Sequence, residues 1–228
     1  MMETKERWMI NVSQFNPTVL SLKDTIYQRI VEMISLGELA PGTTFSEQQL
    51  IRLFAVSKSP VREALIQLCS ENVLRSIPRQ GYQVVEINSK DIQDLTRLRL
   101  LLELGNLPYA IEHLTSERIA ELYRQNAERR LADNKQLWES RNRNTRFHMT
   151  LIRYGENAQI AKCMEHAMAT CTRAYAQLFT AKKHIIAPSD DNQHDLIVRA
   201  LEQHDIYTAH ECLKQDILLM AKTLGVEV

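Results

Sequence analysis

The segment from Ser57 to Leu65, SKSPVREAL, constrains the fold of this chain more than any other. Ser59 can cap a helix with its hydroxyl group, and Pro60 suits the first helical position because its missing N–H would be unpaired there anyway. Lys58 and Arg62 stand off one face of this helix. Apolar side chains at helical spacing form the other face, namely Val61, Ala64, Leu65 and Leu68. The segment therefore predicts a sharply started amphipathic helix, with cations placed to enter a DNA groove.

The charge of the whole chain is balanced, with 28 Lys and Arg residues against 28 Asp and Glu residues. A nucleic-acid partner would therefore have to be bound by a local patch rather than by a global positive charge. Such a patch lies between Arg52 and Gly81, where cations outnumber the two acidic residues Glu63 and Glu71. The cations are Arg52, Lys58, Arg62, Arg75 and Arg79.

A length of 228 residues favours two domains, each large enough to bury its own core. The four cysteines show no CxxC spacing, which indicates reduced thiols rather than disulfides or a thiolate metal site. No signal peptide and no run of transmembrane length is visible, so we expect a cytoplasmic protein without a membrane partner. Residues 1–20 are expected to form a flexible arm.

Three helices are predicted after this arm. Ser21 can cap the first helix, and Gly37 ends it. Ser46 and Gln49 match the S-x-x-Q capping box of a second, short helix. The SKSPVREAL segment then supplies the third helix after a tight turn.

A small β-hairpin is predicted to follow the third helix. Residues 73–77 and 82–87 are rich in β-branched side chains, and the basic turn Pro78–Gly81 joins them. Three helices and a hairpin, with cations at the start of the third helix and at the hairpin tip, predict a winged helix-turn-helix DNA-binding domain over residues 21–87.

Residues 88–228 lack strand signals and predict an all-α bundle of six helices, so the chain as a whole is expected to be mainly α-helical. Ser89 can cap the first of these helices, and Gly105 and Pro108 predict a kink or an early break within it. The other helices are expected from Thr115 or Ser116, over about 135–154, over about 158–183, around 196–201, and over about 206–224.

With these elements in order, the sequence resembles the GntR transcription regulators, specifically the FadR-like subgroup with a C-terminal FCD domain. Three motifs carry the resemblance, namely GELxPG, SxSPVREAL and RQGYxV, all within ISLGELAPGTTFSEQQLIRLFAVSKSPVREALIQLCSENVLRSIPRQGYQVVEI. It covers the chain from about Ser21, and the C-terminal half agrees in its pattern of helices. The resemblance implies a homodimer on a palindromic operator, with residues 88–228 serving for effector binding and dimerisation.

The resemblance also implies which residues approach the DNA. They are Gln48, Ser57, Lys58, Ser59, Arg62, Arg79, Gln80 and Gly81. An Arg side chain can bind guanine through two hydrogen bonds, whereas Lys acts as a point charge. Gln48 and Lys58 stand where many relatives carry Arg, which bears on the operator sequence rather than on DNA binding itself. Gly81 can equally be a simple turn glycine.

A possible metal site lies in the helical half. Asn144 and His148 are four residues apart and project from one helix face. The resemblance is to a site of one Asp or Asn and three His, and it places His194 and Asp216 as the last two ligands, with a carboxylate replacing the final His. This set can hold Zn, or a harder divalent ion such as Mn or Ni. A metal-free polar core is the alternative.

The same domain is expected to bind an effector. Arg99 matches an arginine that can face the cavity in relatives, and Arg173 is a looser candidate. A cation and an arginine would suit a small organic acid, such as a sugar acid or a dicarboxylate. The sequence thus favours a non-enzymatic, effector-modulated repressor of a catabolic operon. The alternatives are a constitutive DNA-binding dimer without effector or metal, and a metal-dependent hydrolase, which the lack of HExxH, a nucleophile motif or a phosphate-binding glycine loop disfavours.

Overall fold

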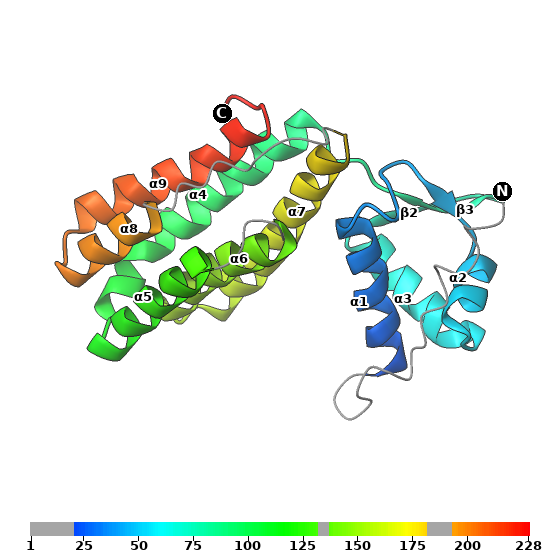
Figure 1. Ribbon diagram of the computed structural model, residues 1–228, viewed down its shortest axis with the longest axis horizontal. Coiled ribbons are helices and arrows are strands. Elements are labelled where there is room, and N and C mark those ends of the chain that lie inside the picture. The colour runs from blue at the N-terminus through cyan, green and yellow to red at the C-terminus, as the bar shows by residue number, and fades with distance from the viewer. Residues whose placement is uncertain (1–20, 132–136, 182–192) are drawn as a thin grey trace. The chain divides into compact units, whose positions relative to one another are not determined.

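The computed structural model describes residues 21–131, 137–181 and 193–228 of a chain that divides into two compact units, Met1–Glu86 and Ile87–Val228 (Figure 1). The predicted arm at residues 1–20, the expected start of a helix near 135 and the Pro188–Asp191 breaker lie outside these ranges. None of the helices in the described ranges combines the length and the apolar character that a membrane span requires.

Three helices frame the first unit, namely α1 (Leu22–Ser35), α2 (Glu47–Phe54) and α3 (Lys58–Ser70). The caps predicted for the first two are confirmed. The backbone N–H of Asp24 donates to the hydroxyl of Ser21 at 3.2 Å, and Ser46 and Gln49 form a capping box. Both α1 and α2 pack against α3, so the caps stabilise the two helices that contact α3.

The start of α3 differs from the prediction. Ser57, not Ser59, is the N-cap residue, and it makes no cap hydrogen bond through its side chain. Pro60 is therefore the third helical residue, where a backbone N–H still has no intrahelical partner, so the proline removes no helical hydrogen bond. Ser59 instead donates a hydrogen bond to Oε1 of Glu63 at 2.8 Å. The helix consequently begins at Lys58, which brings this cation into its first turn.

A three-stranded antiparallel sheet completes the first unit. Its strands are β1 (Thr44–Phe45), β2 (Leu74–Ile77) and β3 (Gly81–Val84), in the order β1-β3-β2. The predicted hairpin of β2 and β3 is confirmed, with Ile77 opposite Gly81. β1 is not visible in the sequence because two residues are too few to show an alternating pattern.

Gly81 is required where β3 meets β1. Its backbone has a φ of +112°, and a Cβ atom there would lie 2.3 Å from the carbonyl oxygen of Phe45. Only glycine accommodates both conditions without displacement of the backbone. Packing within the sheet is therefore enough to account for this glycine, which supports the turn-glycine interpretation of at least part of its role.

The core of the first unit contains the predicted apolar face of α3. Val61, Ala64, Leu65 and Leu68 are all 0% exposed. They pack with apolar side chains of α1, α2 and the sheet, including Ile26, Ile30, Phe45, Leu50, Phe54, Leu74 and Val84. Because this face is fully buried in the core, the opposite face of α3 is the one exposed to solvent.

The described part of the second unit holds six helices, as predicted (Figure 1). They are α4 (Ser89–Glu112), α5 (Ser116–Leu131), α6 (Leu137–Tyr154), α7 (Ala158–Ala181), α8 (Gln193–Glu202) and α9 (Ile206–Thr223). The start of α4 corrects the prediction, since Asn88 caps the helix in a capping box with Asp91. The early break expected near Pro108 does not occur, because α4 continues through this residue to Glu112. In the folded bundle α4 packs against α6, α7 and α9, and tertiary packing of this kind can hold a helix together across a proline.

Buried polar residues interrupt the apolar face of α4 at helical spacing, namely Thr96, Arg99, Glu103 and Asn106. One apolar cluster contains the residues of α4 before this stretch, and another contains those after it. Burying charged side chains is unfavourable unless partners compensate for the lost water. The partners of Arg99 and Glu103 come from α6 and α9, and they define the main candidate site.

Candidate metal centre and nucleic-acid interface

The predicted DNA-contact residues lie at three places on the first unit. Gln48 is on the first turn of α2, a second group lies at the start of α3, and a third lies in the turn between β2 and β3 and at the start of β3. The second group is Ser57, Lys58, Ser59 and Arg62, and the third is Arg79, Gln80 and Gly81. Gly81 is half-buried and the other seven are exposed, so their side chains are accessible to a ligand.

A loose ion pair joins the first turns of α2 and α3. Nζ of Lys58 lies 3.6 Å from Oε1 of Glu47, and the Lys58 side chain is 68% exposed. An exposed pair of this kind contributes at most about 1 kcal/mol. A DNA phosphate can therefore replace Glu47 as the partner of Lys58 at little cost.

Arg62 is a second cation on the same helix. Its side chain is exposed, and its charge acts on Tyr82, where burial raises the pKa and the Arg62 charge opposes this larger effect. An exposed guanidinium on a helix is available to a phosphate or to a guanine edge. The role of Arg62 in base recognition stays a prediction.

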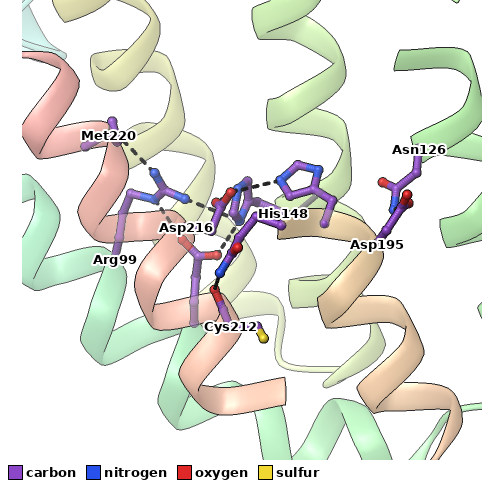
Figure 2. Close-up of polar contacts among 10 residues, drawn as sticks. Arg99, Asn126, His148, Asp195, Cys212, Asp216 and Met220 are labelled. Carbon is purple, nitrogen blue, oxygen red and sulfur yellow. Dashed lines mark hydrogen bonds and ion pairs between the residues drawn. The ribbon is translucent and has the colours of Figure 1, made fainter. Parts of the chain in front are cut away.

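Three of the four predicted metal ligands meet inside the second unit (Figure 2). His148 lies on α6, His194 on α8 and Asp216 on α9, and one ligand atom from each lies within 4.8 Å of the other two. Nε2 of His148 is 3.0 Å from Oδ2 of Asp216, and Nε2 of His194 is 3.4 Å from Oδ1 of the same residue. Both imidazoles are buried.

The donor set fits a divalent ion. Two atoms that share a tetrahedral zinc ion, with bonds of about 2.1 Å, lie about 3.4 Å apart. The contacts of Asp216 with His148 and His194 are close to this separation. The two contacts involve different oxygens of Asp216, and the three ligand atoms lie within 4.8 Å of one another, so the side chains would have to adjust to bring two imidazole nitrogens and one carboxylate oxygen onto one ion.

An aromatic ring packs against both imidazoles. Phe147 stacks on His194 with ring centroids 3.9 Å apart and meets His148 edge-on at 5.6 Å. Phe147 is itself 1% exposed. The ring restricts the rotation of the imidazoles and excludes water from one side of the cluster, which strengthens electrostatic interactions within it.

Two charged residues of α4 lie on the far side of His148. Oε2 of Glu103 is 2.6 Å from Nδ1 of His148, and Nε of Arg99 donates to Oε1 of Glu103 at 2.7 Å. Nη1 of Arg99 also donates to Sδ of Met220 at 3.3 Å (Figure 2). The side chains of Arg99 and Glu103 are 2% and 1% exposed, so this ion pair is fully buried.

The protonation of the cluster follows from these contacts. Burial favours neutral Asp216, but the charges and hydrogen bonds of His194 and His148 hold its pKa well below the usual value. Burial likewise opposes ionisation of Glu103, yet Arg99 and His148 lower its pKa. Burial disfavours the imidazolium form of His148, but the Glu103 charge and the hydrogen bonds of Asp216 and Glu103 raise its pKa overall. Both carboxylates are therefore ionised at neutral pH.

The remaining predicted residues lie around this cluster or apart from it. Asn144 is half-buried on α6, one turn before His148 and on the same face. Arg173 is buried on α7, and its Nη2 donates to Oγ1 of Thr170 at 3.3 Å. Arg99 is buried against Glu103, so an effector carboxylate would have to displace or join Glu103 to reach it. The effector roles of Arg99 and Arg173 stay predictions.

Glu103 is the residue that the sequence analysis missed. It lies four positions after Arg99, which places both charges on one face of α4, and that face is otherwise buried. A charged pair within an inward-facing stripe is the signal that could have revealed it. Since most such pairs on helices face solvent, the spacing alone does not distinguish a buried pair from an exposed one.

Two family models match the chain. Residues 22–84 match the bacterial regulatory proteins of the gntR family, and residues 94–218 match the FCD domain. The second match covers most of the unit that holds the metal cluster, and the first covers the three helices and the sheet of the other unit.

Several curated proteins are similar in sequence. The HTH-type transcriptional regulator YdhC of Bacillus subtilis is 28% identical over 61% of this chain and 63% of its own length. The HTH-type transcriptional regulator McbR of Escherichia coli is 34% identical over 45% of this chain and 47% of McbR. The HTH-type transcriptional repressor RspR of Escherichia coli is 27% identical over 85% of this chain and 84% of RspR. The chain thus spans about half to two thirds of the length of YdhC and McbR.

A solved structure of Escherichia coli McbR/YncC has a similar fold. Its TM-score is 0.74 at 24% identity, over 90% of this chain and 96% of that chain. At this level of identity the likeness shows the fold alone.

Proposed function

We propose that this chain, which belongs to the GntR family of bacterial regulatory proteins in the group with an FCD domain, is a homodimeric repressor of a catabolic operon. Its operator affinity would depend on a small organic acid bound at a buried metal centre. The chain is a transcriptional regulator and not an enzyme, so the hydrolase alternative is set aside. The similarity to RspR, named a repressor, supports the sign of regulation.

One observation carries the proposal, namely the cluster of His148, His194 and Asp216. These residues would hold the ion, with the amide oxygen of Asn144 as a fourth ligand from the turn before His148. A divalent ion bound here supplies a Lewis acid with open positions for an anionic ligand. The harder Asp216 carboxylate widens the choice from Zn to ions such as Mn or Ni.

The charges of the site support an acidic effector. Arg99 and Glu103 carry opposite charges that cancel each other, and Asp216 contributes one negative charge. A divalent ion with two neutral imidazoles would leave one net positive charge in a buried place. An effector carboxylate on the ion would balance this charge, and burial makes such a balance important.

The first unit would bind the DNA. Arg62 and Lys58 on the first turns of α3 would meet base edges and phosphates in the major groove, and Arg79 and Gln80 at the wing tip would contact the neighbouring backbone. In a homodimer, two such units would read the two halves of a palindromic operator. DNA binding therefore requires the second unit to dimerise.

The outer face of α4 supports dimerisation with a second copy of the chain. Leu101 is 75% exposed and Leu98 is 38% exposed, and Gly105, Pro108 and Tyr109 continue the same face without cover from other described residues. Two copies of α4 packed antiparallel about an axis near Gly105 would place Arg97 of one copy opposite Glu112 of the other. The stripe is thus self-complementary in charge as well as apolar, as a two-fold interface requires.

One observation favours the constitutive alternative. His148 already contacts a carboxylate through each ring nitrogen, as it would in a metal-free polar core, although the contact of Nε2 with Asp216 lacks hydrogen-bond geometry. In that case the second unit would only dimerise, and neither ion nor organic acid would alter DNA binding.

Fluorescence anisotropy tests the two functions together. Labelled duplexes that tile the intergenic region upstream of the gene would be titrated with Zn²⁺-loaded, Mn²⁺-loaded and chelator-treated protein, with gluconate and succinate as probes of the acid class. The proposal predicts saturable binding to one palindrome, weakened by an acid in the loaded protein but not in His148→Ala protein. Equal operator affinity under all conditions would support the constitutive alternative, and absence of any palindrome binding at low salt would overturn the regulator.

A further inference from the structure

Glu103 lies directly behind the proposed metal ligand His148. Its Oε2 atom is 2.6 Å from Nδ1 of His148, whereas the other ring nitrogen, Nε2, is 3.0 Å from Oδ2 of Asp216. Glu103 itself is 3% exposed, and its side chain bonds to Arg99 and to His148. It therefore reaches the candidate metal centre through His148.

We propose that Glu103 is a positioning residue, which keeps a proton on Nδ1 of His148 and thereby directs the lone pair of Nε2 at the metal ion. This inference rests on the metal centre proposed above. A neutral imidazole has one N–H and one lone pair, so the hydrogen bond of one nitrogen decides which nitrogen can bind an ion. Carboxylates in this position fix the tautomer and orientation of the ligand and raise its basicity.

The geometry favours Glu103 over Arg99 for this role. Nη2 of Arg99 is 3.3 Å from Nδ1 of His148, which is a longer contact than that of Glu103. Because a guanidinium can only donate, a dominant contact with Arg99 would require the lone pair on Nδ1 and would leave the proton on Nε2, where it blocks the ion. The shorter contact with an ionised carboxylate selects the opposite tautomer.

Arg99 serves instead to hold Glu103 in place. Its Nε atom donates to Oε1 of Glu103 at 2.7 Å, which leaves Oε2 for His148. The contact with Sδ of Met220 on α9 anchors the other end of the guanidinium. These contacts link α9, α4 and α6. The orientation of the ligand His148 therefore depends on three helices of the second unit.

Zn²⁺ affinity measured by chelator competition is the first test. Glu103→Gln keeps the shape of the side chain but removes the acceptor charge, and we expect a 10- to 100-fold loss of affinity. Glu103→Asp should retain part of the affinity because it keeps the carboxylate. Asp94→Asn is the matched control, since Asp94 is an exposed carboxylate on the same helix, and it should bind Zn²⁺ as the wild type does.

The second readout is the position of the proton on His148. If Glu103 had a merely structural role, its substitution would leave this position unchanged. Long-range ¹H–¹⁵N spectra of the metal-free and Zn²⁺-bound proteins should show a protonated Nδ1 in the wild type. In metal-free Glu103→Gln protein Nδ1 should lose its proton, and the imidazole should keep the proton on Nε2, which faces the Asp216 carboxylate. Wild-type Zn²⁺ affinity in Glu103→Gln, or an Nδ1 proton that stays in place, would overturn the inference.

A double variant separates a loss of Zn²⁺ affinity from unfolding of the protein. Arg99→Met with Glu103→Leu removes both buried charges together, and such replacements often preserve stability. We expect this protein to keep its thermal transition while its Zn²⁺ affinity falls as in Glu103→Gln; retained affinity would contradict the role of Glu103. If the wild type itself bound no Zn²⁺, the metal centre would fail, and loss or retention of the Nδ1 proton in metal-free Glu103→Gln protein would still decide whether Glu103 holds that proton on His148.

Discussion

Asp216 lies between two imidazoles, with its Oδ2 atom 3.0 Å from Nε2 of His148 and its Oδ1 atom 3.4 Å from Nε2 of His194. Each histidine comes from a different helix, and α9 carries the carboxylate that faces both. The identity of residue 216 therefore determines both the charge and the hardness of the cluster.

Changing Asp216→His should shift the ion preference of the protein. A third imidazole replaces a hard oxygen donor and removes one negative charge, and imidazoles favour Zn over Mn. We expect the ratio of Zn²⁺ to Mn²⁺ affinity to rise at least about tenfold, as measured by chelator competition and by the EPR signal of free Mn²⁺. Asp216→Asn is the control for charge alone, and an unchanged ratio in Asp216→His would show that residue 216 is not a ligand.

Substitution of Gly81 should destabilise the first unit. Gly81→Ala adds a Cβ atom 2.3 Å from the carbonyl oxygen of Phe45, at a φ of +112°. Gly42→Ala is a matched control, since Gly42 has a φ of +76° but no atom within 4 Å of an added Cβ. Left-handed strain alone costs about 1–2 kcal/mol, and we expect Gly81→Ala to exceed its control by at least about 1 kcal/mol in urea unfolding. Equal losses would mean that β1 does not pack on β3 as described.

The cations of α3 should determine how DNA affinity depends on salt. Each phosphate contact contributes about 0.9 to the slope of log affinity against log salt concentration, so Lys58→Ala should lower the slope by about that amount for any duplex. Arg62→Ala should cost about 1–3 kcal/mol on the palindrome and relax its sequence preference if the guanidinium reads a base. Lys90→Ala, in the second unit, should change neither quantity. A uniform loss for Arg62→Ala on all duplexes would assign this residue to phosphate contact instead.

The α4 interface can be tested by a charge placed at its centre. Leu101→Arg would bury a guanidinium against its own copy across the two-fold axis, and we expect a monomer by analytical ultracentrifugation at concentrations where the wild type is a dimer. Leu196→Arg is the control, because Leu196 is also an exposed leucine of the second unit but lies on α8. A Leu101→Arg dimer with wild-type affinity would place the interface elsewhere.

The elements of the fold are predictable because local signals mark them. The capping box of Ser46 and Gln49 defines the start of α2, and the apolar spacing of α3 predicts its buried face. The errors are local too, since several neighbouring Ser and Asn residues can cap a helix. Ser57 and Asn88 take this role in place of Ser59 and Ser89.

The candidate site is less predictable because it depends on which helix faces meet. The resemblance to a known family placed His148, His194 and Asp216, but nothing local in α4 reveals that Glu103 meets a histidine of α6. Gly81 illustrates the same limit, since the constraint on it comes from Phe45 on a strand that is too short to detect.

Metal content after reconstitution tests the central claim most directly. Purified protein would be stripped with chelator, exposed to Zn²⁺ or Mn²⁺, passed over a desalting column and analysed by mass spectrometry of the elements, beside His148→Ala and His194→Ala proteins of matched folding. The account predicts close to one ion for each wild-type chain and almost none in either variant. The same metal content in all three proteins, or none in the wild type, would contradict it.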